Sequence, residues 1–221
     1  MVRTGGPGMG GVSLLLIEAG MEGFTRTPLR KMGWHASDTA TLYFDDVRVP
    51  VGNLIGEENQ GFRIIMQNFN YERLMMAASC TSFARVCYDE TVAYARERKA
   101  FGHSLLDNQV VHFRLAELRT EVESLKALTY QACEEYVAGG DAVMLASMAK
   151  LKAGRVAREV TDACLQWWGG QGFMWDNNIS RAYRDTRLVS IGGGADEIML
   201  GIIAKLMGTL PSRKSKPASA G

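Results

Sequence analysis

A carboxylate inside an apolar run is the first feature of this sequence that could do chemistry. Glu72 and Arg73 stand between Phe69 and the run Leu74-Met75-Met76-Ala77-Ala78. A carboxyl group that loses water in such surroundings has a raised pKa, in the range that suits a general base. The same two residues could instead form a surface ion pair on a solvated helix stripe. The pattern alone favours the ion pair.

A second candidate is the cationic segment Arg96-Glu97-Arg98-Lys99-Ala100-Phe101-Gly102. Cations in the last turn of a helix complement its dipole, so helix capping is the favoured interpretation. The more specific alternative is that these cations bind a phosphate or pyrophosphate, because guanidinium groups bind these anions strongly.

Two glycine segments could bring bare backbone close to a ligand. Gly169 and Gly170 follow a tryptophan pair, and the segment Ile191–Ile198 contains three successive glycines before a predicted helix start. The amides of such a turn can contact a ligand. Neither segment matches the dinucleotide-binding or the P-loop pattern, so loops that end or begin helices are favoured.

Composition narrows the class of protein. The chain has 221 residues, 47% of them hydrophobic and 22% charged, with a formal net charge of +1. This mix predicts a soluble globular protein and no nucleic-acid or membrane-surface partner. Four single cysteines without metal-ligand spacing predict reduced, buried thiols and no metal site. No targeting signal and no apolar run long enough to span a bilayer are visible.

Hydrophobic spacing predicts a mainly α protein with a β segment before it. Residues 1 to about 55 read as strand and turn, with short apolar or alternating runs between glycines and prolines. From about Gln60 the apolar spacing becomes three and four residues, which predicts helices packed as an antiparallel four-helix bundle. The expected helices span 60–97, 105–138, 142–169, 179–187 and 196–208.

Six segments, taken in order, resemble the acyl-CoA dehydrogenase family over about residues 10–205. They are Lys31-Met32-Gly33, Phe44–Pro50, Gly56–Phe62, Arg98–Gly102, Gly169–Phe173 and Arg184-Asp185. The resemblance implies a helical domain, a middle β domain and a C-terminal bundle, with FAD where the domains and a neighbouring subunit meet. This chain would begin partway through the β domain. We expect a partial β domain at 1–57, the bundle at 58–208 and a disordered tail at 209–221.

The resemblance also implies cofactor-binding residues. Arg98, Phe101 and Gln109 match the family's contacts with the FAD pyrophosphate and adenosine across a dimer interface. Gln166, Gly169 and Gly170 match its adenine-side contact. At the last helix, the family pattern places Ala195 and Glu197 beside the cofactor as well.

The family reaction removes the α-proton of an acyl thioester while the β-hydrogen leaves as hydride to flavin N5. Most members carry the base in a Glu-Gly-Thr motif, and Gly193 stands at that position. A minority, including the isovaleryl-CoA and long-chain enzymes, places the base in a Glu-Arg-Leu motif, which Glu72-Arg73-Leu74 matches. The resemblance therefore implies Glu72 as the base, in a water-poor pocket that raises its basicity.

The same comparison gives the remaining site residues. The backbone N–H of Gly193 falls where the family donates to the thioester oxygen, and Arg73 and Gly194 fall at substrate contacts. Implied partners are an acyl-CoA, an electron-transferring flavoprotein and three further copies in a dimer of dimers. The compartment would be the bacterial cytoplasm or the mitochondrial matrix. Two alternatives are a truncated, non-catalytic oligomerisation module without flavin, and a relative with oxidase or nitroalkane-type chemistry, against which the intact Glu-Arg-Leu pattern argues.

Overall fold

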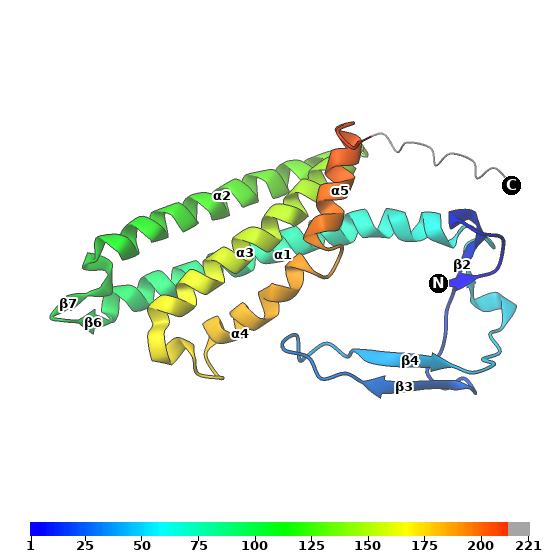
Figure 1. The fold of residues 1–221 in the computed structure, drawn as a ribbon, viewed down its shortest axis with the longest axis horizontal. Helices are drawn as coiled ribbons and strands as arrows, with labels where there is room; N and C mark the ends of the chain where they lie inside the picture. The colour runs from blue at the N-terminus through cyan, green and yellow to red at the C-terminus, as the bar shows by residue number, and fades with distance from the viewer. Residues whose placement is uncertain (212–221) are drawn as a thin grey trace, which may run out of the picture.

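The protein is a long helical bundle joined to a thin strand region (Figure 1). The computed structural model describes residues 1–211. The helices are α1 (Gly61–Glu97), α2 (Gln109–Val137), α3 (Val143–Gly172), α4 (Asn178–Thr186) and α5 (Asp196–Leu206). The strands are β1 (Val2–Arg3), β2 (Val12–Leu15), β3 (Phe24–Pro28), β4 (Ala40–Phe44), β5 (Leu54–Ile55), β6 (Lys99–Ala100) and β7 (His103–Ser104). Short 3-10 turns lie at Met9–Gly11, Val51–Asn53, Leu105–Asp107 and Arg187–Ser190.

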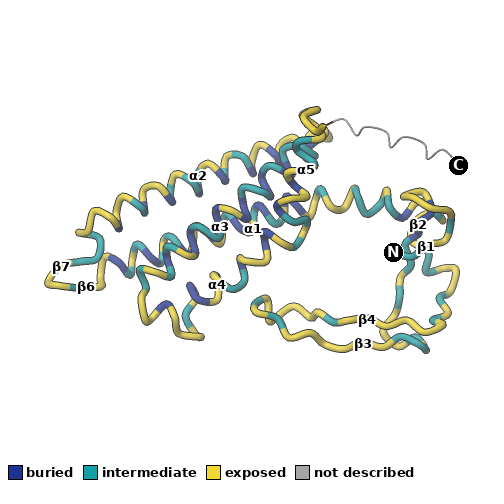
Figure 2. The backbone as a smooth tube through the Cα atoms, in the orientation of Figure 1, coloured by how far each residue is buried: buried dark blue, intermediate teal, exposed yellow. Residues whose placement is uncertain are grey.

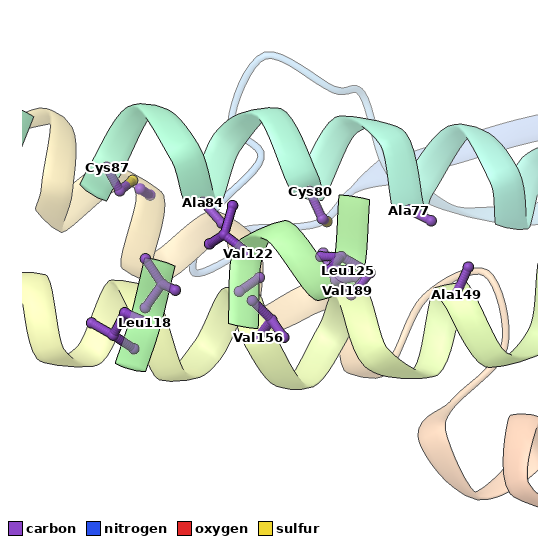
Figure 3. Packing of buried hydrophobic residues seen from close by; sticks show 14 of the residues in the cluster. Ala77, Cys80, Ala84, Cys87, Leu118, Val122, Leu125, Ala149, Val156 and Val189 are labelled. Atoms are coloured by element: carbon purple, nitrogen blue, oxygen red, sulfur yellow. The ribbon is translucent and has the colours of Figure 1, made fainter. Parts of the chain in front are cut away.

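The core of the bundle lies between α1, α2 and α3 (Figure 3). On α2, Leu115, Leu118, Val122 and Leu125 are buried, at the spacing of three and four residues that places side chains on one face. The facing positions of α1 and α3 are mostly small residues, which lets the backbones approach closely. They include Ala77, Ala84, Ala146, Ala149, Ala153 and Ala157.

The predicted mainly α fold is confirmed, with two differences in detail. The fourth position of the bundle is filled by α4 and α5, two short helices that both pack against α3. The helix predicted from residue 105 starts at Gln109, because a capping box between Ser104 and Asp107 first closes a 3-10 turn. The domain boundaries at 57/58 and 208 stay predictions. Most of the predicted disordered tail, 212–221, lies outside the described residues.

The strands form three small antiparallel units. β1, β2 and β5 form one sheet in the order β1-β2-β5, β3 pairs with β4 from Phe24–Phe44 to Pro28–Ala40, and β6 pairs with β7. Between residues 1 and 57 only Gly11 and Ser13 are buried, and the β3–β4 hairpin is exposed along nearly all of its length (Figure 2). The strand region has no hydrophobic core of its own.

Two tight contacts attach the strand region to the helices. At the start of α1, a Cβ on Gly61 would lie 2.6 Å from the Ser13 carbonyl carbon, so glycine is needed where the helix crosses β2. At the far end, a Cβ on Gly33 would lie 2.5 Å from Asp185 Oδ1 in α4. The Trp34 backbone N–H donates to the same carboxylate at 2.6 Å, and its indole N–H donates to the Asp185 carbonyl at 2.8 Å. Two of the six family segments therefore meet in space.

Candidate functional site

Glu72 and Gly193 are brought together by one side chain of α1. Met76 follows Glu72 by four residues, so the two side chains lie on the same face of the helix, one turn apart. A Cβ on Gly193 would collide with Met76 Sδ. The glycine turn before α5 therefore lies against the face of α1 that carries Glu72. Two positions 121 residues apart in the sequence form one candidate site.

The surroundings of Glu72 differ from the expected water-poor pocket. Its carboxylate is exposed and accepts a hydrogen bond from Asn68 Nδ2 at 3.1 Å. Its apolar sequence neighbours Leu74 and Ala77 are buried in the core, on the other side of the helix. Consecutive helical residues point about 100° apart, so an apolar run does not surround its own polar member. Within residues 1–211, Glu72 is therefore not desolvated, and the expected water-poor pocket around it is wrong for this part of the protein.

Arg73 is buried, in contrast to its neighbour Glu72. Its Nη1 donates to Asn70 Oδ1 at 3.0 Å, and its Nε has no hydrogen-bond partner within residues 1–211. Burial lowers the pKa of the guanidinium, partly offset by the nearby Glu72 charge. A buried cation thus lies next to the candidate base.

The turn that carries Gly193 has a backbone conformation that favours glycine. Gly193 and Gly194 have φ values of 63° and 102°, a region that residues with a side chain rarely adopt. A Cβ on Gly194 would also lie 2.6 Å from Met199 Cε. No acceptor for the Gly193 N–H is found among residues 1–211, so this donor is available to a ligand. The turn is built to expose backbone.

The remaining predicted residues at this site flank the start of α5. Ala195 is the N-cap residue, in extended conformation, and Glu197 is exposed in the first turn. Asp196 lies between them, buried, and its Oδ2 accepts a hydrogen bond from Arg158 Nη2 at 3.3 Å. The carbonyl of Gly194 accepts a hydrogen bond from Lys150 Nζ, on α3. Sequence reasoning missed Lys150, Arg158 and Asp196.

The first set of predicted cofactor residues lies at the end of the bundle where α1 passes into α2. Arg98 and Gln109 are exposed on either side of the β6–β7 hairpin. Phe101 forms the tip of that hairpin with φ 55° and is 98% exposed. A fully exposed aromatic ring held in a left-handed conformation offers apolar surface to another molecule.

The second set lies at the end of α3. Gly169 (φ 56°, ψ −137°) interrupts the helical backbone, and a Cβ on Gly169 or Gly170 would meet no atom within 4 Å. The backbone is therefore open to a flat group, and Gln166 is exposed one turn before it.

The structure places the two sets at the same end of the bundle. The Tyr94 ring stacks on Trp168 with centroids 4.2 Å apart and planes 9° from parallel. Trp168 Nε1 also donates to Thr91 Oγ1 at 3.1 Å. Tyr94 lies one turn before Arg98, and Trp168 precedes Gly169. This aromatic pair joins the two sets, and the sequence analysis noted only the tryptophan pair before Gly169.

Within residues 1–211, no cluster of three or more histidine, cysteine or acidic side chains has the geometry to hold a metal ion. None of the helices there combines the length and apolar composition needed to cross a bilayer.

Known proteins resemble this chain in both sequence and fold. The family model "Acyl-CoA dehydrogenase, C-terminal domain" matches residues 59–208. The mitochondrial long-chain specific acyl-CoA dehydrogenase of Sus scrofa is 41% identical over 196 residues, which are 88% of this chain and 46% of that protein. A probable acyl-CoA dehydrogenase from Mycobacterium abscessus has a crystal structure with 45% identity and a TM-score of 0.92, covering 94% of this chain and 55% of that one.

A more distant structure includes a cofactor. The FAD complex of PigA is 25% identical with a TM-score of 0.87, covering 91% of this chain and 53% of that one. This chain spans about half the length of the curated relatives that it matches. The matched residues contain α1 to α5, the glycine turn and both sets of predicted cofactor residues. The chain therefore belongs to the acyl-CoA dehydrogenase family.

Proposed function

We propose that this chain is the C-terminal portion of an FAD-dependent acyl-CoA dehydrogenase that converts an acyl-CoA to the 2-enoyl-CoA. The observation that carries the proposal is the contact between Met76 and Gly193. It places the turn before α5, which carries no side chain at Gly193, against the face of α1 on which Glu72 lies one helical turn away.

In this proposal Glu72 is the general base. Its carboxylate takes the α-proton, and the electron pair of that C–H bond becomes part of the new Cα=Cβ bond. FAD, when bound, supplies the acceptor for the β-hydrogen, which leaves as a hydride. The Gly193 N–H donates to the thioester carbonyl oxygen, where negative charge develops. Arg73 and Gly194 lie on the substrate side of the same site.

The residues at the end of the bundle fit the cofactor. Arg98 supplies a cation for a pyrophosphate, and the open backbone at Gly169 and Gly170 can approach a flat adenine. Phe101, Gln109 and Gln166 border the same surface, and Ala195 and Glu197 would contact the cofactor beside Gly193.

The length of α1 supports sharing of cofactor sites between subunits. Glu72 lies on this helix and Arg98, its C-cap residue, follows 26 residues later, which corresponds to about 39 Å. One chain thus presents its base and its pyrophosphate cation at widely separated places. If two copies pack so that the Arg98 end of each lies beside the Glu72 site of the other, the pair forms two complete sites. This arrangement is consistent with a dimer of dimers. An electron-transferring flavoprotein is the proposed electron acceptor, in a bacterial cytoplasm or mitochondrial matrix.

A second candidate function is favoured by the exposure of Glu72. Within residues 1–211 the side chain of Glu72 is exposed to solvent, and a base exposed in this way lacks the desolvation that its task needs. The 221-residue chain would then be an oligomerisation module that binds no flavin. Purification with added FAD separates the two: a yellow oligomer with a flavin absorption band supports the enzyme, and a colourless folded oligomer supports the module.

Substitution of the base tests the catalytic assignment in the full-length, flavin-loaded enzyme. We expect Glu72→Gln to slow flavin reduction by acyl-CoA by at least about 10²-fold with FAD still bound, because general-base catalysis contributes 10²–10⁴-fold. Glu90→Gln, on the same helix five turns further on, is the matched control and should reduce flavin at the wild-type rate. Normal reduction by Glu72→Gln would refute Glu72 as the base.

A further inference from the structure

Lys150 is a charged side chain at a position where charge is costly. It lies two turns into α3 with 0% of its surface exposed, among the largest fully buried side chains of residues 1–211. Transfer of an ammonium group from water into a protein interior is unfavourable unless hydrogen bonds and opposite charges compensate for it. A lysine in a helical core therefore calls for a physical reason.

The surroundings of Lys150 do not compensate fully for its burial. It faces Arg73 and Cys80 on α1 and Asp196 at the start of α5. Burial lowers the pKa of Lys150, and Asp196 offsets this only in part. The Asp196 carboxylate is shared with Arg158, and one of its oxygens has no partner within residues 1–211. Well-packed apolar residues would stabilise the bundle at least as well.

Lys150 contacts the turn that carries the Gly193 N–H, the proposed hydrogen-bond donor to the thioester oxygen. Its Nζ donates to the Gly194 carbonyl, directly after Gly193. Two successive glycines with positive φ have much conformational freedom, so the turn needs an external anchor to keep one conformation. α3 is a rigid anchor because it packs against α1, the helix that carries Glu72.

We propose that Lys150 is a positioning residue, whose buried ammonium holds the Gly193–Gly194 turn so that the Gly193 N–H meets the thioester carbonyl oxygen. The role of the donor rests on the proposed function, whereas the anchoring of the turn does not. Lys150 touches neither substrate nor cofactor and acts through the turn. A donor fixed before the substrate binds needs no reorganisation during the reaction.

Backbone ¹⁵N relaxation of the 221-residue chain tests the anchoring. Lys150→Met removes the charge and keeps most of the side-chain length. We expect the order parameters of Gly193 and Gly194 to fall from about 0.85 to below about 0.6, while those of α3 stay unchanged. The thermal midpoint should hold or rise, because a buried charge has been removed. Lys152→Met, two residues on and paired with Glu121, is the control and should leave the turn ordered.

A second measurement on the wild type keeps the proposal testable if Lys150→Met does not fold. A buried, hydrogen-bonded ammonium exchanges its protons slowly, so one protected lysine ¹H–¹⁵Nζ signal is expected and should persist in Lys152→Met. Absence of that signal, or a turn that stays ordered in Lys150→Met, overturns the proposal. A lower midpoint with an ordered turn would show that Lys150 only stabilises the bundle, which also overturns it.

Kinetics in the full-length, flavin-loaded enzyme link the anchor to the reaction. Misplacement of a catalytic group by about 1 Å can cost roughly 10²-fold. We expect Lys150→Met to lower kcat for flavin reduction by roughly 10- to 100-fold, with little change in KM, and an unchanged kcat overturns the catalytic part of the proposal. If the turn loosens but Glu72→Gln still reduces flavin normally, the anchoring stands and the proposed function fails.

Discussion

The helical bundle has a hydrophobic core of its own, and the strand region does not. Between α1 and α5 a continuous set of buried side chains joins three long helices, whereas residues 1–57 bury only Gly11 and Ser13 (Figure 2). The β3–β4 hairpin leaves Leu42, Tyr43 and Phe44 exposed. A two-stranded hairpin with both faces open has little stability of its own. The bundle is a folding unit, and the strand region depends on what it contacts.

This difference also divides the candidate site. The groups that must be placed accurately, Glu72, Gly193 and Lys150, belong to the bundle and are held by packed helices. The solvent side of Glu72, which would have to be closed for desolvation, has no cover from the strand region of this chain. In the proposed reaction, the bundle of this chain would position the groups, whereas its strand region leaves the solvent side of Glu72 open.

The largest contrast is expected from matched truncations in the two regions. Leu118→Ala, at a fully buried position of α2, should lower the free energy of unfolding by about 2–5 kcal/mol, because it leaves a cavity. Phe44→Ala, at a position that is 55% exposed and paired with Phe24, should cost no more than about 1 kcal/mol.

Urea unfolding of both variants, followed by circular dichroism, measures this contrast. Val110→Ala, at an exposed position of α2, is the control for a change in helix composition and should stay within about 0.5 kcal/mol of wild type. Equal losses for Leu118→Ala and Phe44→Ala would contradict the idea that only the bundle has a core.

Alkaline pH should destabilise the bundle through its buried thiols. Burial raises the pKa of Cys87 to about 12, and those of Cys80 and Cys164 to about 11, from 9.0. Between pH 9 and 11 these thiols ionise in the unfolded chain but stay protonated in the folded one. Unfolding then releases protons, so the free energy of unfolding falls as the pH rises. The loss approaches the order of 2 kcal/mol per thiol.

The thiol contribution is isolated by comparing wild type with Cys87→Ala from pH 8 to 10.5. Lys150, whose pKa burial lowers, gives the opposite slope in both proteins and cancels in the difference. The variant should lose less stability with pH than wild type. Parallel profiles for the two proteins would argue against a buried, protonated Cys87. The strand region contains no cysteine, so it contributes nothing to this effect.

The sequence predicted the parts of this fold that depend on local spacing. The apolar spacing of three and four residues predicted helices with one buried face, which α2 shows from Leu115 to Leu125, and the glycines at 169 and 192–194 predicted breaks in the helices. Both predictions use information within about three helical turns. The site residues that the family segments imply stay predictions.

The predictions that failed or were missing concern direction and distance. Leu74 and Ala77, apolar neighbours of Glu72 in sequence, face away from it, because the helix rotates them into the core. Lys150 gave no signal, since lysine is normally a surface residue. The contact between Trp34 and Asp185 spans 151 residues, and a single sequence contains no information on such pairs.

A smaller effect is expected where the two regions touch. Asp185→Ala removes the acceptor for the Trp34 backbone N–H and should cost about 1–2 kcal/mol. Because the β3–β4 hairpin is held at this end by Trp34, the cost should appear locally, as faster amide exchange in the hairpin. Hydrogen exchange with mass spectrometry measures it, and Asp162→Ala on α3 is an exposed control. Faster exchange throughout α1 and α3 would mean that the two regions unfold together.

The smallest effect on the bundle should come from the largest deletion. A chain that starts at residue 58 loses the whole strand region, yet nearly all of the core lies between α1 and α5. We expect its urea unfolding to stay cooperative and its free energy of unfolding to change by less than about 1 kcal/mol. Amide exchange should quicken only in the first turns of α1, where Gly61 packs on Ser13.

The complementary peptide, residues 1–57, gives the reverse expectation. It should show no cooperative transition and no strand signal in circular dichroism, because two isolated hairpin strands and a three-stranded sheet of very short strands cannot bury enough apolar surface. A folded peptide, or a bundle that unfolds without it, would move the predicted boundary between residues 57 and 58. Independent folding of the bundle alone would mean that Glu72, Gly193 and Lys150 reach their relative positions without the strand region.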